Sequence, residues 1–343
     1  MMQKRVTFYL PLKTRNDATI YYTELIKRAF ISLGFIVEDK LKIFKASDSD
    51  FIVAITPADA YHIKVVNPQS KIMTWFQGIG PEEYFLLHGR SLRSSIMKRY
   101  LEFFEKKALV QSDISLFVSH AMQKHYQDKY EIVPRNYLVI PCYNKNLRDD
   151  LIIPEDSRYQ KLKFVYAGGM FAWQCIDKTL KVFKVIENQY PDASLTLLTG
   201  EKSVAEKLLQ KYKIKNAVIK YVSLNKLDDE LSQYKYGFLL RDNIKVNNVA
   251  TPTKMNSYLS VGILPIYSNV VNSFEENLNL DSFCVKVSDG ETIEMIAEKI
   301  IKHHQSNLDL NKLRPLLEKI YQNYYNDDRY ILLLKHAITK YYK

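Results

Sequence analysis

Two basic residues, Arg241 and Lys254, stand in a short segment whose composition suits the binding of a phosphate group. Arg241 directly follows an apolar run at 236–240 that predicts a buried strand. Lys254 stands at the predicted start of a short helix, which the chain opens with Thr251, Pro252 and Thr253. An arginine at a strand end, a helix dipole and free N–H groups at a helix start all attract anions. The segment therefore predicts a diphosphate site; the alternative is an ordinary strand-loop-helix turn whose cations are solvated.

Glycines follow two other predicted strands in the second half of the chain. Gly168 and Gly169 follow the first of these strands, and Gly200 follows the second. Glycine lets the backbone approach a phosphate closely, although a simple tight turn has the same signature. The turn after the first of these strands is therefore a candidate to line the same diphosphate site.

In the first half, polar side chains follow a predicted strand at 71–76. Gln77 comes directly after this strand, and Glu82 and Glu83 stand at the start of the next predicted helix. A glutamine can hydrogen-bond a hydroxyl but cannot act as a general base. The two carboxylates can orient a hydroxyl, or they can simply favour the positive end of the helix dipole. We keep all three as candidates for contact with a hydroxyl-bearing substrate.

These residues need a scaffold, and the sequence predicts one in each half of the chain. Apolar runs typical of buried strands alternate with segments of helical periodicity. Such alternation predicts parallel sheets covered by helices, and 343 residues suit two domains. We therefore predict an α/β protein with two Rossmann-like domains, at 1–150 and 160–320. A polar linker at 149–161 joins them, and a C-terminal helix at 321–343 packs back on the first domain.

The predicted strands fix where the candidate residues stand. In the first half a long helical stretch ends near residue 109, and strands are predicted at 5–10, 51–55, 71–76, 114–118 and 137–140. In the second half strands are predicted at 162–167, 194–199, 217–222, 236–240 and 263–267.

Composition limits the classes of function. Hydrophobic residues make up 47% of the chain and charged residues 25%, which is typical of a globular protein. No apolar run approaches the roughly 20 residues that a membrane span needs, and the amino terminus predicts a strand rather than a signal peptide. Three separated cysteines form no disulfide or metal pattern, so we expect a cytoplasmic protein. The net charge of +11 suits a nucleotide diphosphate or an anionic membrane surface, and no sequence motif supports a nucleic-acid partner.

The segment around Lys254 resembles the donor-binding region of retaining, two-domain nucleotide-sugar glycosyltransferases of family 4. In that family an arginine at a strand end precedes a loop and a helix of the pattern P-x-K-x-x-E-Y-L-x-x-G. Ser257 stands where the family has the glutamate assigned to the donor ribose, and the pattern is otherwise matched by Pro252, Lys254, Tyr258, Leu259 and Gly262.

Two further segments resemble the same family with substitutions. The turn that begins at Gly168 resembles the family's G-R-x-x-x-x-K-G turn, with Gly169 and Gln174 at the approximate arginine and lysine positions. Gln77 stands where relatives often have a histidine near the transferred sugar. In this family the leaving phosphate is commonly described as accepting the acceptor's proton, so the loss of that histidine is compatible with catalysis.

The resemblance implies the GT-B architecture, in which two Rossmann-like domains face each other across a cleft. It implies transfer of a hexose-type unit, with retention, from a nucleotide diphosphate sugar to a glycan or lipid-linked glycan in surface polysaccharide biosynthesis. The implied catalytic residues are Gln77, Glu82, Glu83, Arg241 and Lys254. The implied donor-binding residues are Gly168, Gly169, Gln174, Gly200, Arg241, Asn247, Thr251, Pro252, Thr253, Lys254, Ser257 and Tyr258.

No cofactor and no metal ion is expected for this reaction, because cationic side chains and a helix start can neutralise the leaving diphosphate. The run Asp48-Ser49-Asp50 matches the residue pattern of a metal-binding DxD motif. It precedes a predicted strand, so we expect it to lie away from the carboxyl ends of the strands, where the predicted site lies.

Two points stay open at the level of sequence: the class of function and the setting of the segment 84–109. A GT-B nucleotide-sugar epimerase and a glycan-binding protein without catalysis are the alternatives to a transferase. The second draws support from the departures at Gln77, Gly169, Gln174 and Ser257. The segment 84–109 mixes basic and apolar residues, which suits either a helix resting on the inner face of an anionic membrane or a plain surface helix.

Overall fold

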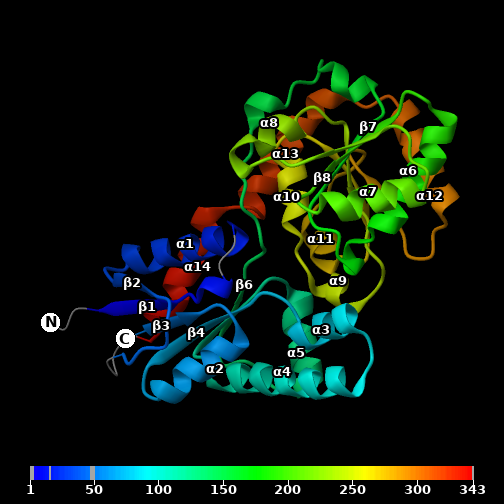
Figure 1. The fold of residues 1–343 in the computed structure, drawn as a ribbon. Helices are drawn as coiled ribbons and strands as arrows, with labels where there is room; N and C mark the ends of the chain where they lie inside the picture. The colour runs from blue at the N-terminus through cyan, green and yellow to red at the C-terminus, as the bar shows by residue number, and fades with distance from the viewer. Residues whose placement is uncertain (1–3, 15–16, 47–50, 342–343) are drawn as a thin grey trace. The chain divides into compact units, whose positions relative to one another are not determined.

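The computed structural model describes residues 4–14, 17–46 and 51–341, which form two compact α/β units (Figure 1). Unit 1 contains the described residues of Met1–Asn144, Val249–Thr251 and Asn326–Lys343. Unit 2 contains Lys145–Asn248 and Pro252–Tyr325. Each unit is therefore assembled from separate stretches of the chain.

Unit 1 is built on a six-stranded parallel sheet with the order β2-β1-β3-β4-β5-β6. Its strands are β1 (Arg5–Tyr9), β2 (Ile36–Lys40), β3 (Phe51–Ala54), β4 (Lys71–Phe76), β5 (Ile114–Phe117) and β6 (Tyr137–Val139). The chain adds β2 on one side of β1 and the later strands on the other, so the strand order reverses between β1 and β3. At such a switch point the loops after the strands diverge and leave room for a ligand at the carboxyl edge of the sheet.

Unit 2 repeats this plan with the strand order β12-β11-β10-β7-β8-β9, again entirely parallel. Its strands are β7 (Lys163–Ala167), β8 (Ser194–Leu198), β9 (Ala217–Lys220), β10 (Tyr236–Leu239), β11 (Leu264–Ser268) and β12 (Val285–Val287). Here the order reverses between β7 and β10. Two parallel sheets of six strands confirm the predicted pair of Rossmann-like α/β domains.

The central strands of unit 2 are buried along their whole length, which explains why they are continuous apolar runs in the sequence. Every residue of β10 and β11 is buried, as expected for parallel strands covered on both faces. Packing explains why position 237 in β10 is a glycine: a Cβ atom there would lie 2.6 Å from the ring of Tyr258.

Helices cover the sheet of unit 1. They are α1 (Asp17–Ser32), α2 (Pro57–Val66), α3 (Gly80–His88), α4 (Leu92–Gln111), α5 (His120–Tyr130) and α14 (Asp327–Thr339). Tyr22 of α1 stacks on Trp75 of β4 with ring centroids 3.7 Å apart. The C-terminal helix α14 lies beside α1 (Figure 1), where Asp327 accepts a hydrogen bond from the Tyr21 hydroxyl at 3.1 Å. The last helix of the chain thus belongs to the core of its first unit.

Helices also cover the sheet of unit 2. They are α6 (Ile176–Gln189), α7 (Lys202–Lys211), α8 (Leu227–Leu231), α10 (Thr253–Leu259), α11 (Asn272–Asn277), α12 (Ile293–Gln305) and α13 (Leu313–Asn323). The short helix α9 (Lys245–Val249) stands in the loop between β10 and α10. None of the helices described in either unit is both long and apolar enough to cross a membrane.

The structure corrects several details of the sequence-based expectations. Strand β2 was not predicted, and the expected long helix before residue 109 is two helices, α3 and α4. Gly89 separates them with a φ of 69°, which favours glycine and ends α3. The stretch expected to be a polar linker is packed on unit 2: Arg158 is 3% exposed and donates hydrogen bonds to the carbonyls of Leu151 and Val261 at 3.0 and 2.8 Å.

Candidate functional site

The strongest candidate site lies at the carboxyl edge of the unit 2 sheet, where the strand order reverses. Gly168 follows β7 and Arg241 lies just beyond β10, and these two strands are paired neighbours. Lys254 comes from the first turn of α10, which packs on β10 and β11. Three segments that are distant in the sequence therefore meet at the position where doubly wound α/β folds bind ligands.

Arg241 is a buried cation. Its side chain is 3% exposed, and its backbone N–H donates to the Ser268 hydroxyl at 2.9 Å. The guanidinium donates to the backbone carbonyl of Gln174 at 3.1 Å and to the side-chain amide oxygen of the same residue at 2.6 Å. No ion pair joins it to a carboxylate in the described part of the chain, and burial lowers its pKa. A buried guanidinium that has only neutral partners is suited to receive an anion.

Lys254 is a second buried cation beside it. The ammonium donates to the same amide oxygen of Gln174 at 3.0 Å and lies 3.8 Å from the centroid of the Tyr166 ring. Burial, and then the charge of Arg241, lower the pKa of Lys254 well below its ordinary value. Among the described residues it too forms no ion pair with a carboxylate. A phosphate placed here would relieve the repulsion between the two cations.

Gln174 holds the two cations at a common point. It ends the short 3-10 helix Ala172–Gln174, and Cys175 then turns the chain into α6 with a left-handed φ of 52°. Its amide oxygen accepts from both Arg241 and Lys254. An oxygen atom at this position can therefore accept hydrogen bonds from both positively charged side chains.

The glycine turn after β7 borders this point. Gly168 has a φ of 136°, and a Cβ atom there would lie 3.1 Å from the ammonium nitrogen of Lys254. The carbonyl of Gly169 accepts a hydrogen bond of 2.5 Å from the Tyr166 hydroxyl. The next N–H, of Met170, donates to the carboxylate of Glu201. The glycine at 168 thus lets the backbone lie directly against the buried lysine.

Sequence reasoning missed three residues that position this site: Tyr166, Glu201 and Ser268. Tyr166 lies inside the apolar run of β7, and Ser268 is the last residue of β11, so neither belongs to a recognisable motif. Glu201 follows Gly200, which was predicted to bind the donor but has only the Tyr221 ring within 4 Å of a Cβ position. Their contacts depend on the pairing of strands, which local sequence patterns do not reveal.

Other predicted donor residues make structural hydrogen bonds in unit 2. The Tyr258 hydroxyl accepts from the N–H of Ala167 at 3.1 Å and donates to the carbonyl of Phe238 at 3.2 Å, so it ties β7 to β10. The Ser257 hydroxyl donates to the carbonyl of Thr253 at 3.3 Å, within α10. Asn247 is buried and its amide donates to the carbonyl of Asp242 at 3.0 Å, which closes the loop after Arg241.

The start of α10 differs from the expected helix opening. The helix begins at Thr253. Pro252 occupies the N-cap position, and its side chain has no atom that could accept a hydrogen bond from the helix start. Thr251 belongs to unit 1, where its hydroxyl accepts a hydrogen bond from the N–H of Cys142 at 3.0 Å. Thr251 therefore anchors the chain to unit 1 and does not cap the helix.

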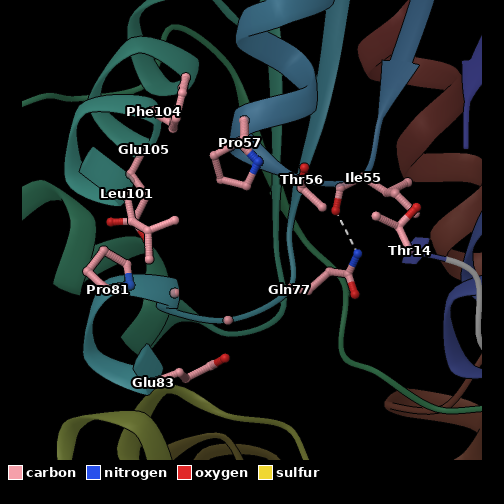
Figure 2. Close-up of a pocket in the computed structure, with 13 residues that line it drawn as sticks. Thr14, Ile55, Thr56, Pro57, Gln77, Pro81, Glu83, Leu101, Phe104 and Glu105 are labelled. Carbon is pink, nitrogen blue, oxygen red and sulfur yellow. Dashed lines mark hydrogen bonds between the residues drawn. The ribbon is translucent and has the colours of Figure 1, made fainter. Parts of the chain in front are cut away.

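A pocket of about 330 Å³ lies at the carboxyl edge of the unit 1 sheet (Figure 2). Its walls come from the loops after β1, β3 and β4 and from the helices α2, α3 and α4. Gln77 lines it, and its side-chain N–H₂ donates to the carbonyl of Ile55 at 2.6 Å. The pocket is mainly apolar, with Pro57, Pro81 and Phe104 among its walls.

Glu83 also lines this pocket, whereas Glu82 is not among the lining residues. The Glu83 carboxylate packs against Gly78, where any side chain would overlap it. Burial raises the pKa of Glu83, with a backbone hydrogen bond from Ile79 acting in the opposite direction. Glu82 forms an ion pair with Lys129 at 2.9 Å. The sequence analysis assigned both carboxylates to one site, but in the structure only Glu83 of the two lines the pocket.

A third carboxyl group in the pocket wall, Glu105 of α4, was not predicted. It is 3% exposed and accepts hydrogen bonds from the hydroxyls of Tyr126 and Tyr130 at 3.0 and 2.6 Å. The single proton of the Tyr126 hydroxyl is shared between Glu105 and the carbonyl of Gly78, which lies 2.8 Å away. Burial raises the pKa of Glu105 to about 7, and Lys129 is the largest opposing influence. Glu105 therefore links α4 and α5 to the loop that carries Gln77.

Metal-ligating side chains do not gather in the described ranges: no three His, Cys, Asp or Glu residues there lie close enough together to hold one ion. The run Asp48-Ser49-Asp50 lies outside the described residues.

Comparisons with known proteins identify the fold. Neither a protein-family model nor a curated protein matches the sequence. Among solved structures, HepE from Anabaena in complex with UDP-glucose has a TM-score of 0.69 at 8% identity, over 98% of this chain and 99% of that one. A glycosyltransferase from Rickettsia africae has a TM-score of 0.66 at 10% identity, again over 98% and 99% of the two chains.

TarM from S. aureus, in a complex that contains UDP, has a TM-score of 0.63 at 11% identity. The match covers 95% of this chain but only 60% of TarM. These similar structures are GT-B glycosyltransferases, and the chain shares their two-sheet α/β fold.

Proposed function

We propose that the protein is a retaining hexosyltransferase that moves a sugar from a nucleotide diphosphate sugar to a glycan or lipid-linked glycan, as in family 4 and in surface polysaccharide biosynthesis. The observation that carries this proposal is the pair of buried cations, Arg241 and Lys254, whose hydrogen bonds converge on one oxygen atom. Two desolvated positive charges held by neutral partners fit a diphosphate better than any neutral ligand.

The cations have a direct role in the proposed reaction. The bond between the anomeric carbon and the phosphate oxygen breaks while the acceptor hydroxyl oxygen bonds to the same carbon on the same face. The acceptor's proton passes to the leaving phosphate. Negative charge grows on that phosphate during bond breaking, so fixed positive groups beside it stabilise the transition state more than the bound donor. Arg241 and Lys254 supply this charge without a metal ion.

We assign the acceptor to the pocket of unit 1. Its apolar walls suit the faces of a sugar ring or a lipid carrier, and its few polar groups suit hydroxyls. The side-chain N–H₂ of Gln77 is held by Ile55 at 2.6 Å, which leaves its carbonyl oxygen to accept from a hydroxyl. Glu83 offers a second acceptor on the same wall.

We also propose that the tip of α3 and α4 rests on an anionic membrane surface at the cytoplasmic face. Leu86 and Leu87 of α3 and Leu92 and Ile96 of α4 are exposed, with Leu92 at 80%. Exposed arginines lie among them at 90 and 93. Apolar side chains beside arginines match the interface of an anionic bilayer. Sedimentation with phosphatidylglycerol vesicles should carry the protein down, and the double variant Leu92→Ser, Ile96→Ser should stay in solution.

The enzymatic proposal is tested by a screen of nucleotide diphosphate sugars, first for thermal stabilisation and then for donor turnover. Selective stabilisation by one donor, followed by transfer or slow hydrolysis with retained anomeric configuration, is the expected result. Conversion of the donor to an epimer without an acceptor would indicate an epimerase. Stabilisation by a glycan with no donor turnover would indicate a binding protein, the reading favoured by Gln77 and Ser257.

A further inference from the structure

A third buried cation, Lys235, lies at the opposite end of the unit 2 sheet from Arg241. It immediately precedes β10, whereas Arg241 lies beyond the carboxyl end of that strand. Lys235 is 4% exposed, and its backbone N–H donates to the carbonyl of Lys163 at 3.2 Å. Its ammonium contacts His304 Nδ1 at 2.9 Å and the Tyr236 ring at 5.1 Å from the centroid. Across the described ranges it forms no ion pair with a carboxylate.

The protonation of the two partners is set by their surroundings. Burial lowers the pKa of Lys235 to about 8 and, together with the charge of that lysine, lowers the pKa of His304 to about 4. Near neutral pH the lysine is therefore charged and the imidazole is neutral. The ammonium must donate to Nδ1, so the ring proton sits on Nε2. The charged ammonium of Lys235 therefore donates to a neutral acceptor, the imidazole of His304.

Lys235 and its partner His304 both line a polar pocket of about 290 Å³. Besides Lys235 and His304, the side-chain amides of Gln160 and Asn307 line it, as does Ser306, whose hydroxyl donates to the carbonyl of His303 at 2.7 Å. The one carboxylate among its lining residues, Asp156, is engaged by Arg158: the backbone N–H of Arg158 donates to it at 2.8 Å, and the guanidinium Nε lies 3.6 Å away. The pocket thus combines an unpaired buried cation with neutral donors and enough space for a phosphate group.

We propose that this pocket binds a small oxyanion, a phosphate group that is either free or carried as the monoester of a small metabolite. An ammonium buried without a counter-ion is costly, and a phosphate would supply the missing charge and accept the remaining N–H donors. The site is separate from the proposed donor site, because the two lie at opposite ends of β10. It does not depend on the proposed transferase activity.

The test measures binding of inorganic phosphate and of glucose 6-phosphate to the full chain by calorimetry at constant ionic strength. The donor site can also attract phosphate, so the variants compared are Lys235→Met, Lys254→Met and the exposed Lys302→Met. We expect Lys235→Met to weaken the phosphate affinity at least tenfold, while Lys254→Met and Lys302→Met leave a site of wild-type affinity. Lys235→Arg should keep most of the affinity.

Folding and function provide the controls. Lys235→Met should melt at a temperature at least as high as the wild type, because it removes an unpaired buried charge, and it should retain the wild-type affinity for a nucleotide diphosphate sugar. Tighter binding of glucose 6-phosphate than of phosphate would identify a monoester as the ligand, and the reverse would identify free phosphate. Unchanged phosphate affinity in Lys235→Met, or no binding of either anion at millimolar concentration, would overturn the proposal.

Discussion

At the scale of single residues, Gln174 determines how Arg241 and Lys254 can act. One amide oxygen accepts from both side chains, so both cations are already oriented toward a shared point. Two positive charges would otherwise repel each other in a buried site. The arrangement keeps the charges within reach of one anion at the cost of stability in the free protein.

We expect Arg241→Ala and Lys254→Ala each to weaken donor binding by about 1.5–3 kcal/mol, the range for charge-assisted hydrogen bonds. Calorimetric titration with the donor found in the nucleotide-sugar screen measures the effect. Lys302→Ala, an exposed lysine on α12, is the matched control and should bind the donor like the wild type. Wild-type affinity in both site variants would remove the diphosphate from this location.

Gly168 offers a second residue-scale prediction. In Gly168→Ala, the new methyl group would lie 3.1 Å from the Lys254 ammonium at a φ of 136°, so donor affinity should fall along with stability, the latter by about 1–3 kcal/mol. Gly290→Ala is the control, because that glycine also has a positive φ, of 83°, but nothing within 4 Å. Gly290→Ala should lose stability and keep donor affinity. An equal loss of affinity in the two variants would mean that backbone strain, and not the contact with Lys254, is responsible.

At the scale of elements, Glu105 couples α4 and α5 to the loop after β4 through Tyr126 and Tyr130. Because burial raises its pKa from 4.5 to about 7, the folded protein holds a proton that the unfolded chain releases between these values. The contribution of Glu105 to stability is therefore largest below about pH 4.5 and is lost as the pH rises toward 7.

We expect Glu105→Gln to gain stability relative to the wild type as the pH rises from 5 to 8, by up to about 3 kcal/mol. Urea unfolding of both proteins at several pH values measures the difference. A difference that stays constant across this range would show that Glu105 ionises normally. Glu206→Gln, which changes an exposed glutamate of α7, is the control and should show little change.

The elements also show what the sequence could predict. Strands β3, β4, β7, β10 and β11 were predicted because buried parallel strands are apolar along their length. Strand β2 was missed because it lies at the edge of its sheet, and its sequence IVEDK is only half buried. Helix α9 was missed because KVNNV has neither length nor a clear apolar face.

The site was predictable to a similar degree. Arg241 and Lys254 could be selected because they stand at a strand end and a helix start. Tyr166 and Glu105 could not, because one lies within a buried strand and the other within a helix, where an aromatic or charged residue has many ordinary uses. Their roles follow only from contacts made between elements, and the binding roles of all these residues stay predictions.

At the scale of the whole molecule, the proposed chemistry relies on protein cations, so we expect sugar transfer to continue in excess EDTA. Transfer is measured with and without EDTA, and again after Mg²⁺ or Mn²⁺ is added. Activity that EDTA abolishes and a divalent ion restores would contradict the metal-free mechanism. Gln77→Ala, assayed in parallel, should lower turnover more than donor affinity, because the proposed partner of Gln77 is the acceptor.

The route of the chain has a consequence for how this protein can be divided or can exchange parts with its relatives. Residues 249–251 belong to unit 1 although both neighbouring stretches belong to unit 2, and α14 completes unit 1 after unit 2 has ended. The Ser119 hydroxyl donates to the carbonyl of Val249 at 2.6 Å, which fixes this short stretch in place. A single cut near residue 145 would therefore remove α14 from the first fragment. The side of α1 that α14 covers would then be exposed to solvent. A gene fusion that replaces unit 1 must exchange three separate segments together, and one that replaces unit 2 must exchange two. We therefore expect the two units to be inherited together.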